Sequence, residues 1–197
     1  MLIIEHRVNS LAGLIAVPPE HGVEIDVRHD NRTDGLYLNH NPGAGETLEE
    51  YLKQFRHAFV ILNIKEAGIE QRCIDLAAQY GLRKEQYFLL DVEFPYLYAA
   101  SRAGVREIAI CYSEDEPIEQ ALRYQGKVDW VWIDTMTRLP LDEEIVRKLR
   151  GFKTCLVSPD RWGRPEDIKP YQEKIKELGF RLDAVMVGKA YAHLWGE

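Results

Sequence analysis

The sequence predicts an α/β protein, folded as a compact (β/α)8 TIM barrel with a small β-hairpin after its second strand. Short runs of apolar and β-branched residues recur eight times along the 197 residues, with loops and helical patterns between them. This alternation is typical of parallel strands joined by helices. Most runs are hydrophobic nearly throughout, as strands buried on both faces should be. The number of runs favours a closed barrel over an open doubly wound sheet, which is the competing architecture.

Each of the eight apolar runs is predicted to form one strand of the barrel. An extra apolar run, residues 36–39, follows Asp34 and Gly35. Because Asp-Gly is a strong turn signal, this run is expected to form the hairpin beyond the second strand. The eight barrel strands are expected at residues 2–5, 23–27, 58–64, 87–91, 107–112, 129–134, 153–157 and 182–187.

Helix signals lie between the predicted strands. Thr47 with Glu50, and Ser113 with Glu116, have the spacing of capping boxes that begin helices. Apolar residues at helical spacing predict further helices, each ended by a glycine. These are residues 69–80 with Gly81, residues 142–149 with Gly151, and residues 165–178 with Gly179.

Composition predicts a single domain over residues 1–197, because 46% hydrophobic and 29% charged residues suffice for a packed core. A formal net charge of −7 argues against general nucleic-acid binding, which relies on clustered Lys and Arg. No apolar run approaches the roughly 20 residues that a membrane span needs. Charged residues interrupt the apolar start, so no signal peptide is expected and the expected location is the cytoplasm.

Two smaller features are predicted from the sequence as well. Cys73, Cys111 and Cys155 are few and widely spaced, which indicates reduced core cysteines rather than disulfides or a zinc site. Residues 191–195 are expected to form an amphipathic tail that packs on the barrel or on another subunit.

Ionisable residues follow most of the predicted strands, at the ends where such a barrel places its chemistry. Glu24 and Asp26 matter most, because alternation along a strand puts both carboxylates on one side. Helices cover the outside of a barrel, so the two charges are expected to point inward near the mouth. Two like charges there need a cation, and oxygen ligands suit Mg²⁺ or Ca²⁺ rather than zinc.

Other residues near the expected mouth are weaker candidates. Trp130 and Trp132 are expected to pack in the core. The polar loop of residues 160–164 follows the seventh strand, where phosphate sites of barrels often lie, so Arg161 is a candidate for binding substrate phosphate. The vaguer candidates are Tyr112, Ser113, Asp134 and Lys189.

A set of motifs occurs in order over roughly the first third of the chain. They are His6-Arg7, Asn9-Ser10-Leu11, Gly22-Val23-Glu24-Ile25-Asp26-Val27, Asp34-Gly35, His40-Asn41-Pro42 and Asn63-Ile64-Lys65. In order and spacing, this set resembles the N-terminal signature of the glycerophosphodiester phosphodiesterase family. Beyond it, only the rhythm of strands and helices is similar.

The resemblance implies a β/α barrel with a divalent metal at its mouth. It also implies a phosphoric diester hydrolase that acts on a small glycerophosphodiester-like molecule, with a place in lipid metabolism. A metal and cationic side chains would stabilise charge on the phosphate oxygens, and two imidazoles would move the protons. The residues implied are Glu24, Asp26 and Asn63 as metal ligands, His6 and His40 as the acid/base pair, and Arg7 and Lys65 as phosphate contacts.

The chain also departs from the family pattern. Val8 stands where the family usually has Gly, and Asn41 stands where it has Asp. Asn63 stands where the family has a metal-binding Glu, and Asp91 or Glu93 on the next strand could replace the missing carboxylate.

Two other functions stay open at this point. Asn41 and Asn63 suggest a non-catalytic relative that binds a phosphorylated small molecule or partner. A different barrel enzyme, such as a sugar-phosphate isomerase or lyase, could use Lys65 or Lys189 as a base or Schiff-base former. The sequence leaves the oligomeric state open.

Overall fold

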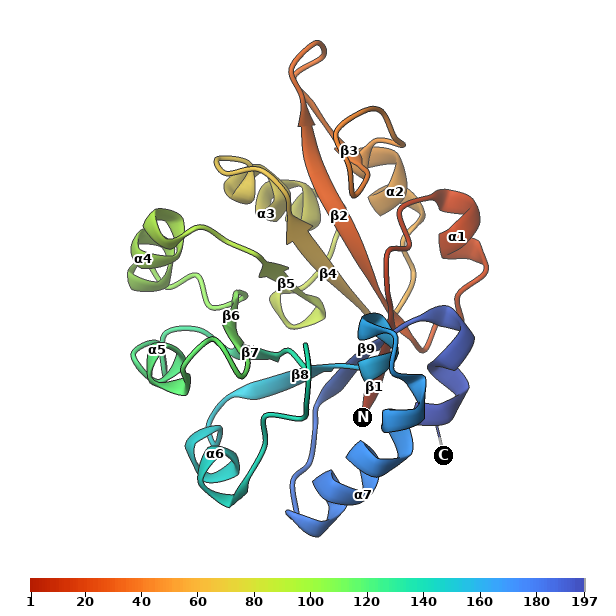
Figure 1. Cartoon of the computed structure of the whole chain (residues 1–197). Helices are drawn as coiled ribbons and strands as arrows, with labels where there is room; N and C mark the ends of the chain where they lie inside the picture. Colours follow the sequence, from red (N-terminus) through yellow and green to blue (C-terminus); the bar gives the residue numbers. More distant parts are fainter. Residues whose placement is uncertain (197) are drawn as a thin grey trace.

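Eight parallel strands form a nearly closed ring, and helices surround it (Figure 1). The structure is a computed structural model, and it describes residues 1–196. The strands run round the ring in the order β5-β4-β2-β1-β9-β8-β7-β6. Their bounds are β1 (Leu2–Glu5), β2 (Gly22–Asp30), β4 (Phe59–Ile64), β5 (Tyr87–Leu90), β6 (Ala109–Tyr112), β7 (Trp130–Ile133), β8 (Lys153–Val157) and β9 (Ala184–Val187).

The ring is weakest between β5 and β6. There, Leu89 and Ile108 form an isolated parallel bridge, and the Leu89 N–H donates to the Glu107 carbonyl at 2.9 Å. The other neighbouring strands pair over at least two residues each. The predicted barrel is therefore confirmed, and the open doubly wound sheet is wrong.

The helices connect successive strands and are mostly short. Thr47 caps its helix as predicted, because its hydroxyl accepts the Glu50 N–H at 3.2 Å. The predicted cap at Ser113 is wrong: Ser113 and Glu116 close a turn, and the helix begins only after Pro117. The helices are α1 (Leu11–Ile15), α2 (Leu48–Gln54), α3 (Glu70–Gln79), α4 (Phe94–Arg102), α5 (Ile118–Leu122), α6 (Glu143–Lys148) and α7 (Ile168–Glu177), with 3-10 turns η1 (Lys84–Gln86), η2 (Pro159–Trp162), η3 (Pro165–Asp167) and η4 (Lys189–Trp195).

The expected hairpin is present and extends beyond the ring (Figure 1). Strand β3 (Gly35–Leu38) runs antiparallel to β2, which is longer than predicted because it continues to Asp30. Asp34 takes a left-handed conformation with φ 55°, which Asp tolerates better than most residues. This turn directs the chain after β3 back towards the mouth of the barrel.

Alternation along the strands separates two buried layers. Val23, Ile25 and Val27 point outward into the core beneath the helices. A second apolar cluster fills the inside of the barrel, and it includes Trp130 and Trp132 as expected for core residues. Phe59, Phe88 and Trp130 pack with tilted rings near the amino ends of the strands, with ring centroids 4.9–5.6 Å apart. These rings fill the interior at the amino ends, and a cavity lies at the carboxyl ends.

Gly22 lies in a crowded part of the barrel. A Cβ at this position would lie 3.0 Å from the Phe59 carbonyl oxygen and 3.1 Å from Cγ1 of Ile4. We expect Gly22→Ala to lower the free energy of unfolding by about 1–3 kcal/mol, because neither neighbour can move freely in a packed barrel. Urea denaturation measures this loss. Gly43→Ala is the control, since a Cβ there would have no heavy atom within 4 Å, and equal stability of the two variants would contradict the prediction.

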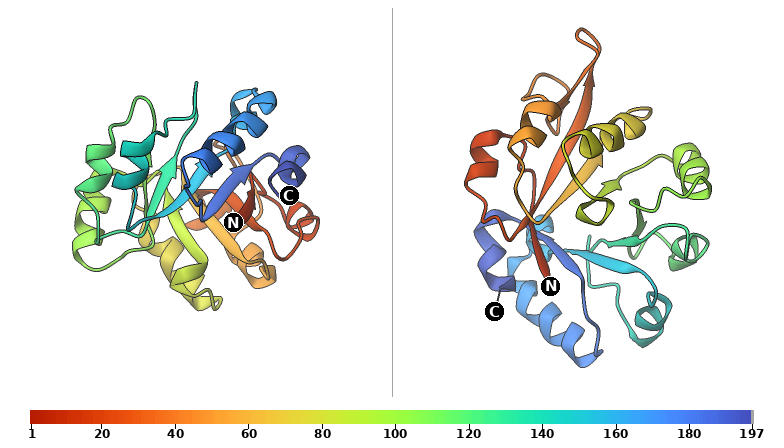
Figure 2. Two further views of the ribbon diagram at one scale, coloured as in Figure 1. Left: turned by 90° about the horizontal axis from the view of Figure 1, so that it is seen from below. Right: turned by 180° about the vertical axis from the view of Figure 1, so that it is seen from behind.

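The first strand, β1, and the last described turn, η4, lie side by side (Figures 1 and 2). The expected tail is η4, which contacts β1, and the Trp195 indole donates to Ser158 Oγ at 2.9 Å. The tail therefore packs on the barrel. Cys73, Cys111 and Cys155 are free thiols, as expected. Among residues 1–196, every helix is too short or too polar to cross a lipid bilayer.

Candidate active site at the barrel mouth

A cavity of about 320 Å³ opens at the carboxyl ends of the strands. Strands β2 and β7 face each other across it, because β4, β5 and β6 separate them on one side and β1, β9 and β8 on the other. Polar residues line one part of the cavity and apolar residues line another. The lining residues are His6, Arg7, Glu24, Asn63, Leu90, Asp91, Trp132, Asp134, Val157, Arg161, Trp162 and Met186.

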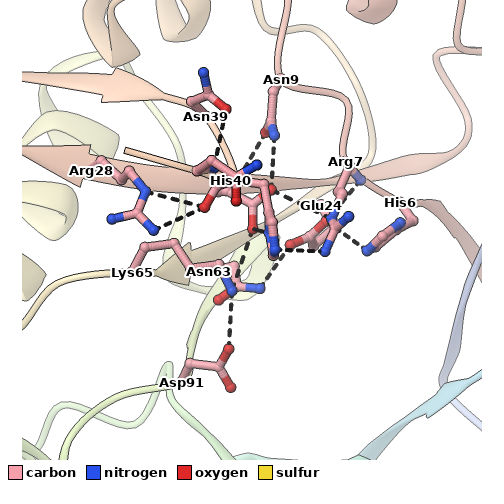
Figure 3. A network of polar contacts seen from close by, with 12 residues as sticks. His6, Arg7, Asn9, Glu24, Arg28, Asn39, His40, Asn63, Lys65 and Asp91 are labelled. Atoms are coloured by element: carbon pink, nitrogen blue, oxygen red, sulfur yellow. Dashed lines mark hydrogen bonds and ion pairs between the residues drawn. The ribbon is translucent and has the colours of Figure 1, made fainter. Parts of the chain in front are cut away.

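Glu24 points inward from β2, as predicted, and its side chain is almost completely buried (Figure 3). Its Oε2 accepts the Arg7 N–H at 2.8 Å, and its Oε1 accepts the Asn63 amide at 2.9 Å. His6 Nε2 lies 3.9 Å from the same Oε2. Burial, followed by the charge of Asp26, raises the pKa of Glu24 above its ordinary value, despite these hydrogen bonds. The site therefore holds a carboxylate that lacks a full positive partner.

Asp26 is also buried and points to the same side as Glu24. Asn9 binds it twice: the Asn9 amide donates to Oδ2, and Asn9 Oδ1 accepts the Asp26 N–H, both at 2.8 Å. His40 Nδ1 lies 3.1 Å and Lys65 Nζ lies 3.3 Å from Oδ1. Burial acts to raise the pKa of Asp26, but the hydrogen bonds from Asn9 and His40 and the charge of Lys65 outweigh it and lower that pKa.

His40 reaches this site from the segment after β3. Asp26 accepts from Nδ1 when that nitrogen carries the proton, which leaves Nε2 free to accept from Arg7 Nη2 at 2.9 Å. Arg28 holds the backbone, because its guanidinium donates twice to the His40 carbonyl at 2.9 and 3.2 Å. An ion pair from Arg28 to Glu66 at 2.9 Å fixes that guanidinium.

Two residues at the ends of strands have strained backbones. Arg7 follows β1 with φ 54°, and Asp91 follows β5 with φ 58°. A non-glycine residue pays roughly 1–2 kcal/mol for this conformation, and such strain often occurs at functional sites. At Arg7 the turn aims the N–H at Glu24 and the guanidinium at His40.

His6 borders the cavity beside Glu24. Burial, together with the charges of Arg161 and Arg7, lowers the pKa of His6 to about 3. This low pKa keeps the His6 imidazole neutral at neutral pH, and an anion bound beside it would raise that pKa.

Arg161 enters the cavity from η2, after β8. Its neighbour Asp160 accepts the Gly188 N–H at 3.0 Å, and Asp160 Oδ2 lies 3.9 Å from Arg161 Nη1. A Cβ at Gly188 would lie only 2.6 Å from Asp160 Oδ2, so this close approach requires glycine. The predicted loop is thus anchored to the end of β9, with Arg161 directed at the same cavity as His6.

The other candidates from the sequence are placed differently. Lys65 lies between Asp26 and Asp91, with Nζ 3.3 Å from each. Asp91 lines the cavity, whereas Glu93 precedes α4 and does not line it. Tyr112, Ser113 and Lys189 also lie outside the cavity, whereas Asp134 lines it.

Sequence reasoning missed several residues that build the site. Arg28 acts through a contact to a residue 12 positions away, which no local pattern marks. Asn9 belongs to one of the quoted motifs, but its contact to Asp26, 17 positions away, was not predicted. Leu90 and Met186 line the cavity as well. The exposed Trp162 also lines it, and it belongs to the predicted loop of residues 160–164. Inward alternation could have identified Leu90 and Met186, since both belong to the apolar cluster inside the barrel.

The chemistry of the donor set fits a hard cation with few protein ligands. Among residues 1–196, no three His, Cys, Asp or Glu side chains converge closely enough to hold a metal ion. Asn63 Oδ1, however, is buried next to Glu24 and has no hydrogen-bond partner. Two carboxylates and an amide oxygen are ligands that Mg²⁺ or Ca²⁺ accepts, with water completing the shell.

Comparisons with known proteins extend these observations. No protein-family model and no curated protein matches the sequence. Solved structures do match. A crystal structure from Agrobacterium tumefaciens, named as a candidate glycerophosphoryl diester phosphodiesterase, superimposes with a TM-score of 0.69 at 14% identity, covering 99% of this chain and 96% of that one. A glycerophosphodiester phosphodiesterase from the same organism gives a TM-score of 0.61 at 13% identity, covering 94% and 96%. At this identity, the likeness establishes a common fold.

Proposed function

We propose that this chain is a phosphoric diester hydrolase that acts on a small glycerophosphodiester-like molecule. One observation carries the proposal: the buried carboxylates Glu24 and Asp26 lie at a barrel mouth that also gathers two imidazoles and several cationic side chains. Two carboxylates buried side by side are costly unless a cation compensates them. The fold is the one found in the structures named as phosphodiesterases.

The cationic residues suit a phosphodiester, which carries one negative charge. Arg7 and Arg161 line the cavity, and Lys65 approaches it between two carboxylates. Guanidinium groups match phosphate oxygens in geometry as well as charge. Negative charge grows on the phosphoryl oxygens as the nucleophile attacks, so fixed cations stabilise the transition state more than the ground state.

His6 and His40 would move the protons. Neutral imidazole can accept a proton from the attacking water, and imidazolium can give one to the leaving alkoxide as the ester P–O bond breaks. The products are then a phosphomonoester and an alcohol. Asp26 supports His40 in this role, since a carboxylate at Nδ1 fixes the tautomer and stabilises the imidazolium. Arg7 lies on His40 Nε2 in the absence of substrate, so a bound phosphate would draw the guanidinium away and free that nitrogen.

A divalent cation, Mg²⁺ or Ca²⁺, would be held by Glu24, Asp26 and Asn63. When bound, it would offset the charge of the two carboxylates and withdraw electrons from the phosphoryl group. Asn63 Oδ1, buried and without a partner, supports this assignment. Asp91 lines the same cavity and stays the alternative ligand; like Asp26, it pairs with Lys65.

Hydrolysis of bis(p-nitrophenyl) phosphate tests the proposal. We expect turnover in Mg²⁺, Mn²⁺ or Ca²⁺, a loss of at least about tenfold in EDTA, and recovery when the metal is restored. A lack of turnover with every metal would refute the proposed hydrolase function. Turnover that EDTA leaves unchanged would refute the proposed dependence on a metal ion.

A second candidate is binding of a phosphorylated molecule without turnover. The hydrogen bonds of Glu24 favour this candidate. Asn63 and the Arg7 N–H already bind both of its carboxylate oxygens, which are then less available to a metal ion. Calorimetry with a glycerophosphodiester separates the two candidates, because binding with no product supports this one and turnover excludes it. A Schiff-base enzyme has less support, because Lys65 lies between two carboxylates and Lys189 lies outside the cavity.

A further inference from the structure

A second hollow lies on the outside of the barrel, between α4 and α5 (Figures 1 and 2). Its volume is about 750 Å³, which exceeds that of the cavity at the mouth. Phe94 and Tyr98 line it from α4, and they are 64% and 48% exposed. The two residues lie four positions apart, so both rings project from one face of the helix. The fold therefore leaves an aromatic edge uncovered beside this hollow.

Cations without acidic partners border the aromatic edge. Arg102, Arg123 and Lys127 line the hollow, and all three are exposed. Among residues 1–196, no Asp or Glu lies within ion-pair distance of any of them. The one acidic side chain in the described lining, Glu119, pairs with Lys148 at 3.1 Å. The hollow therefore carries local positive charge on a protein whose formal net charge is −7.

The rings and one guanidinium group form a column along α4. Phe94 and Tyr98 pack with ring centroids 6.1 Å apart, and the guanidinium carbon of Arg102 lies 3.6 Å from the centroid of the Tyr98 ring. Arg102 also donates to the Tyr98 carbonyl at 3.0 Å. Because Arg102 covers one face of Tyr98 and Phe94 packs against the same ring, Tyr98 has little free face on which a planar ligand could stack. The column presents ring edges and a charged end instead.

A lipid surface with acidic headgroups matches both properties of the column. Aromatic side chains favour the level of the headgroups, where an apolar ring and a polar surrounding coexist. Exposed Lys and Arg are attracted to acidic lipids, and their stems can lie along apolar surface while their charges stay in water. The net negative charge of the whole chain repels such a surface, so attraction must come from a local group of unpaired cations.

We propose that one face of the barrel docks the protein on an anionic lipid surface. This basic aromatic face consists of Phe94, Tyr98, Arg102, Arg123 and Lys127. None of these residues lines the cavity at the mouth, so the inference goes beyond the proposed function and does not depend on it.

The position of the charges sets the orientation. Arg102 ends α4 and Lys127 precedes β7, so the cations lie towards the amino ends of the strands. Acidic Glu93, by contrast, precedes α4 near the mouth. The headgroups therefore contact the end of the face that is distant from the mouth. Docking holds the barrel on its side, with its mouth open to solvent next to the lipid.

Sedimentation with lipid vesicles tests the inference on the whole chain. One set of vesicles contains equal parts of phosphatidylglycerol and phosphatidylcholine, and the other contains phosphatidylcholine alone. At about 0.1 M NaCl, where charges act over about 10 Å, we expect the wild type to bind the anionic vesicles at least about tenfold more tightly. At about 1 M NaCl, where this distance falls to about 3 Å, most of that preference should disappear.

Two variants separate the charges from the rings. Arg102→Gln, Arg123→Gln and Lys127→Gln together should weaken binding to anionic vesicles by about 100-fold, since each cation near such a surface contributes about fivefold. Phe94→Ala with Tyr98→Ala should weaken binding by about tenfold or more, because no ring then enters the headgroup layer. All five side chains are exposed, so both variants should keep the wild-type melting temperature and the wild-type hydrolysis of bis(p-nitrophenyl) phosphate.

A charge-matched control separates the face from the net charge. Lys169→Gln, Lys176→Gln and Arg181→Gln together remove three exposed cations in and after α7, on another side of the barrel. This control should bind anionic vesicles within about twofold of wild type, because exposed charges beyond about 10 Å of the surface are largely screened. An equal loss of binding in the control and in the triple variant of the face would overturn the inference.

Three other outcomes would also overturn it. They are a wild type that binds neither set of vesicles, equal binding to both sets, and full binding by the variant without Phe94 and Tyr98. If the wild type ignores vesicles but forms a dimer in sedimentation velocity that Phe94→Ala and Tyr98→Ala break, the face joins two copies of the chain instead. Hydrolysis of bis(p-nitrophenyl) phosphate tests the proposed function separately from all of these.

Discussion

His40→Ala is expected to lower kcat for phosphodiester hydrolysis by about 10²- to 10⁴-fold, the range that one positioned proton-transfer group contributes. Asp26 orients the His40 imidazole through Nδ1, and Nε2 points towards Arg7. No other described residue takes both contacts. The side chain is 40% exposed, so its removal creates no core cavity and should change the melting temperature little. Steady-state kinetics and thermal unfolding measure the two effects.

The matched control is His193→Ala, an exposed histidine in η4, away from the cavity. It should keep wild-type kinetics and stability. Arg28→Ala provides an intermediate case, because it releases the backbone of His40 without removing the imidazole. A His40→Ala enzyme with more than about half of wild-type kcat would show that His40 takes no part in proton transfer.

The barrel could be predicted from the sequence because its strands are buried on both faces. Continuous apolar runs such as 58–64 have no amphipathic alternative, so both their type and their order were correct. The helices were harder to predict. Helix α1 has five residues and one buried side chain, Leu14, so it leaves almost no periodic pattern. At Ser113, local side-chain bonding formed a turn, and Pro117 set the true start of the helix.

The site was predictable only where a local pattern carried the information. Glu24 and Asp26 lie two positions apart on one strand and therefore share a face, so their common orientation followed from strand geometry. The roles of Asn9 and Arg28 depend on contacts that only the folded chain creates. The left-handed conformation of Arg7 could not be predicted either, since arginine gives no local signal for positive φ. The two acidic residues could therefore be predicted from the sequence, but the residues that contact them from distant parts of the chain could not.

Glu24→Gln is expected to stabilise the metal-free protein at alkaline pH while abolishing its response to metal. In the wild type, burial and Asp26 raise the pKa of Glu24. A carboxyl group whose folded pKa is raised contributes most stability below its unfolded pKa and loses that contribution as pH rises through the folded value. Glutamine does not titrate, so this loss disappears. Its amide keeps only one acceptor oxygen, so either the Arg7 N–H or the Asn63 amide loses its acceptor, a cost of about 1 kcal/mol that is independent of pH.

The pH dependence separates these two effects. Measured in EDTA, the stability of Glu24→Gln relative to wild type should rise by about 1–3 kcal/mol between about pH 5 and about pH 8, because only the charge term titrates. Glu85→Gln, an exposed residue in η1, should show no such rise. Adding Mg²⁺ or Ca²⁺ at about pH 8 should raise the melting temperature of the wild type but not of Glu24→Gln, since binding to the native state alone stabilises it. Parallel pH profiles for wild type and Glu24→Gln would mean that the charge of Glu24 is already compensated by the protein. Such a site would need no cation, and the case for a metal at this mouth would fail with it.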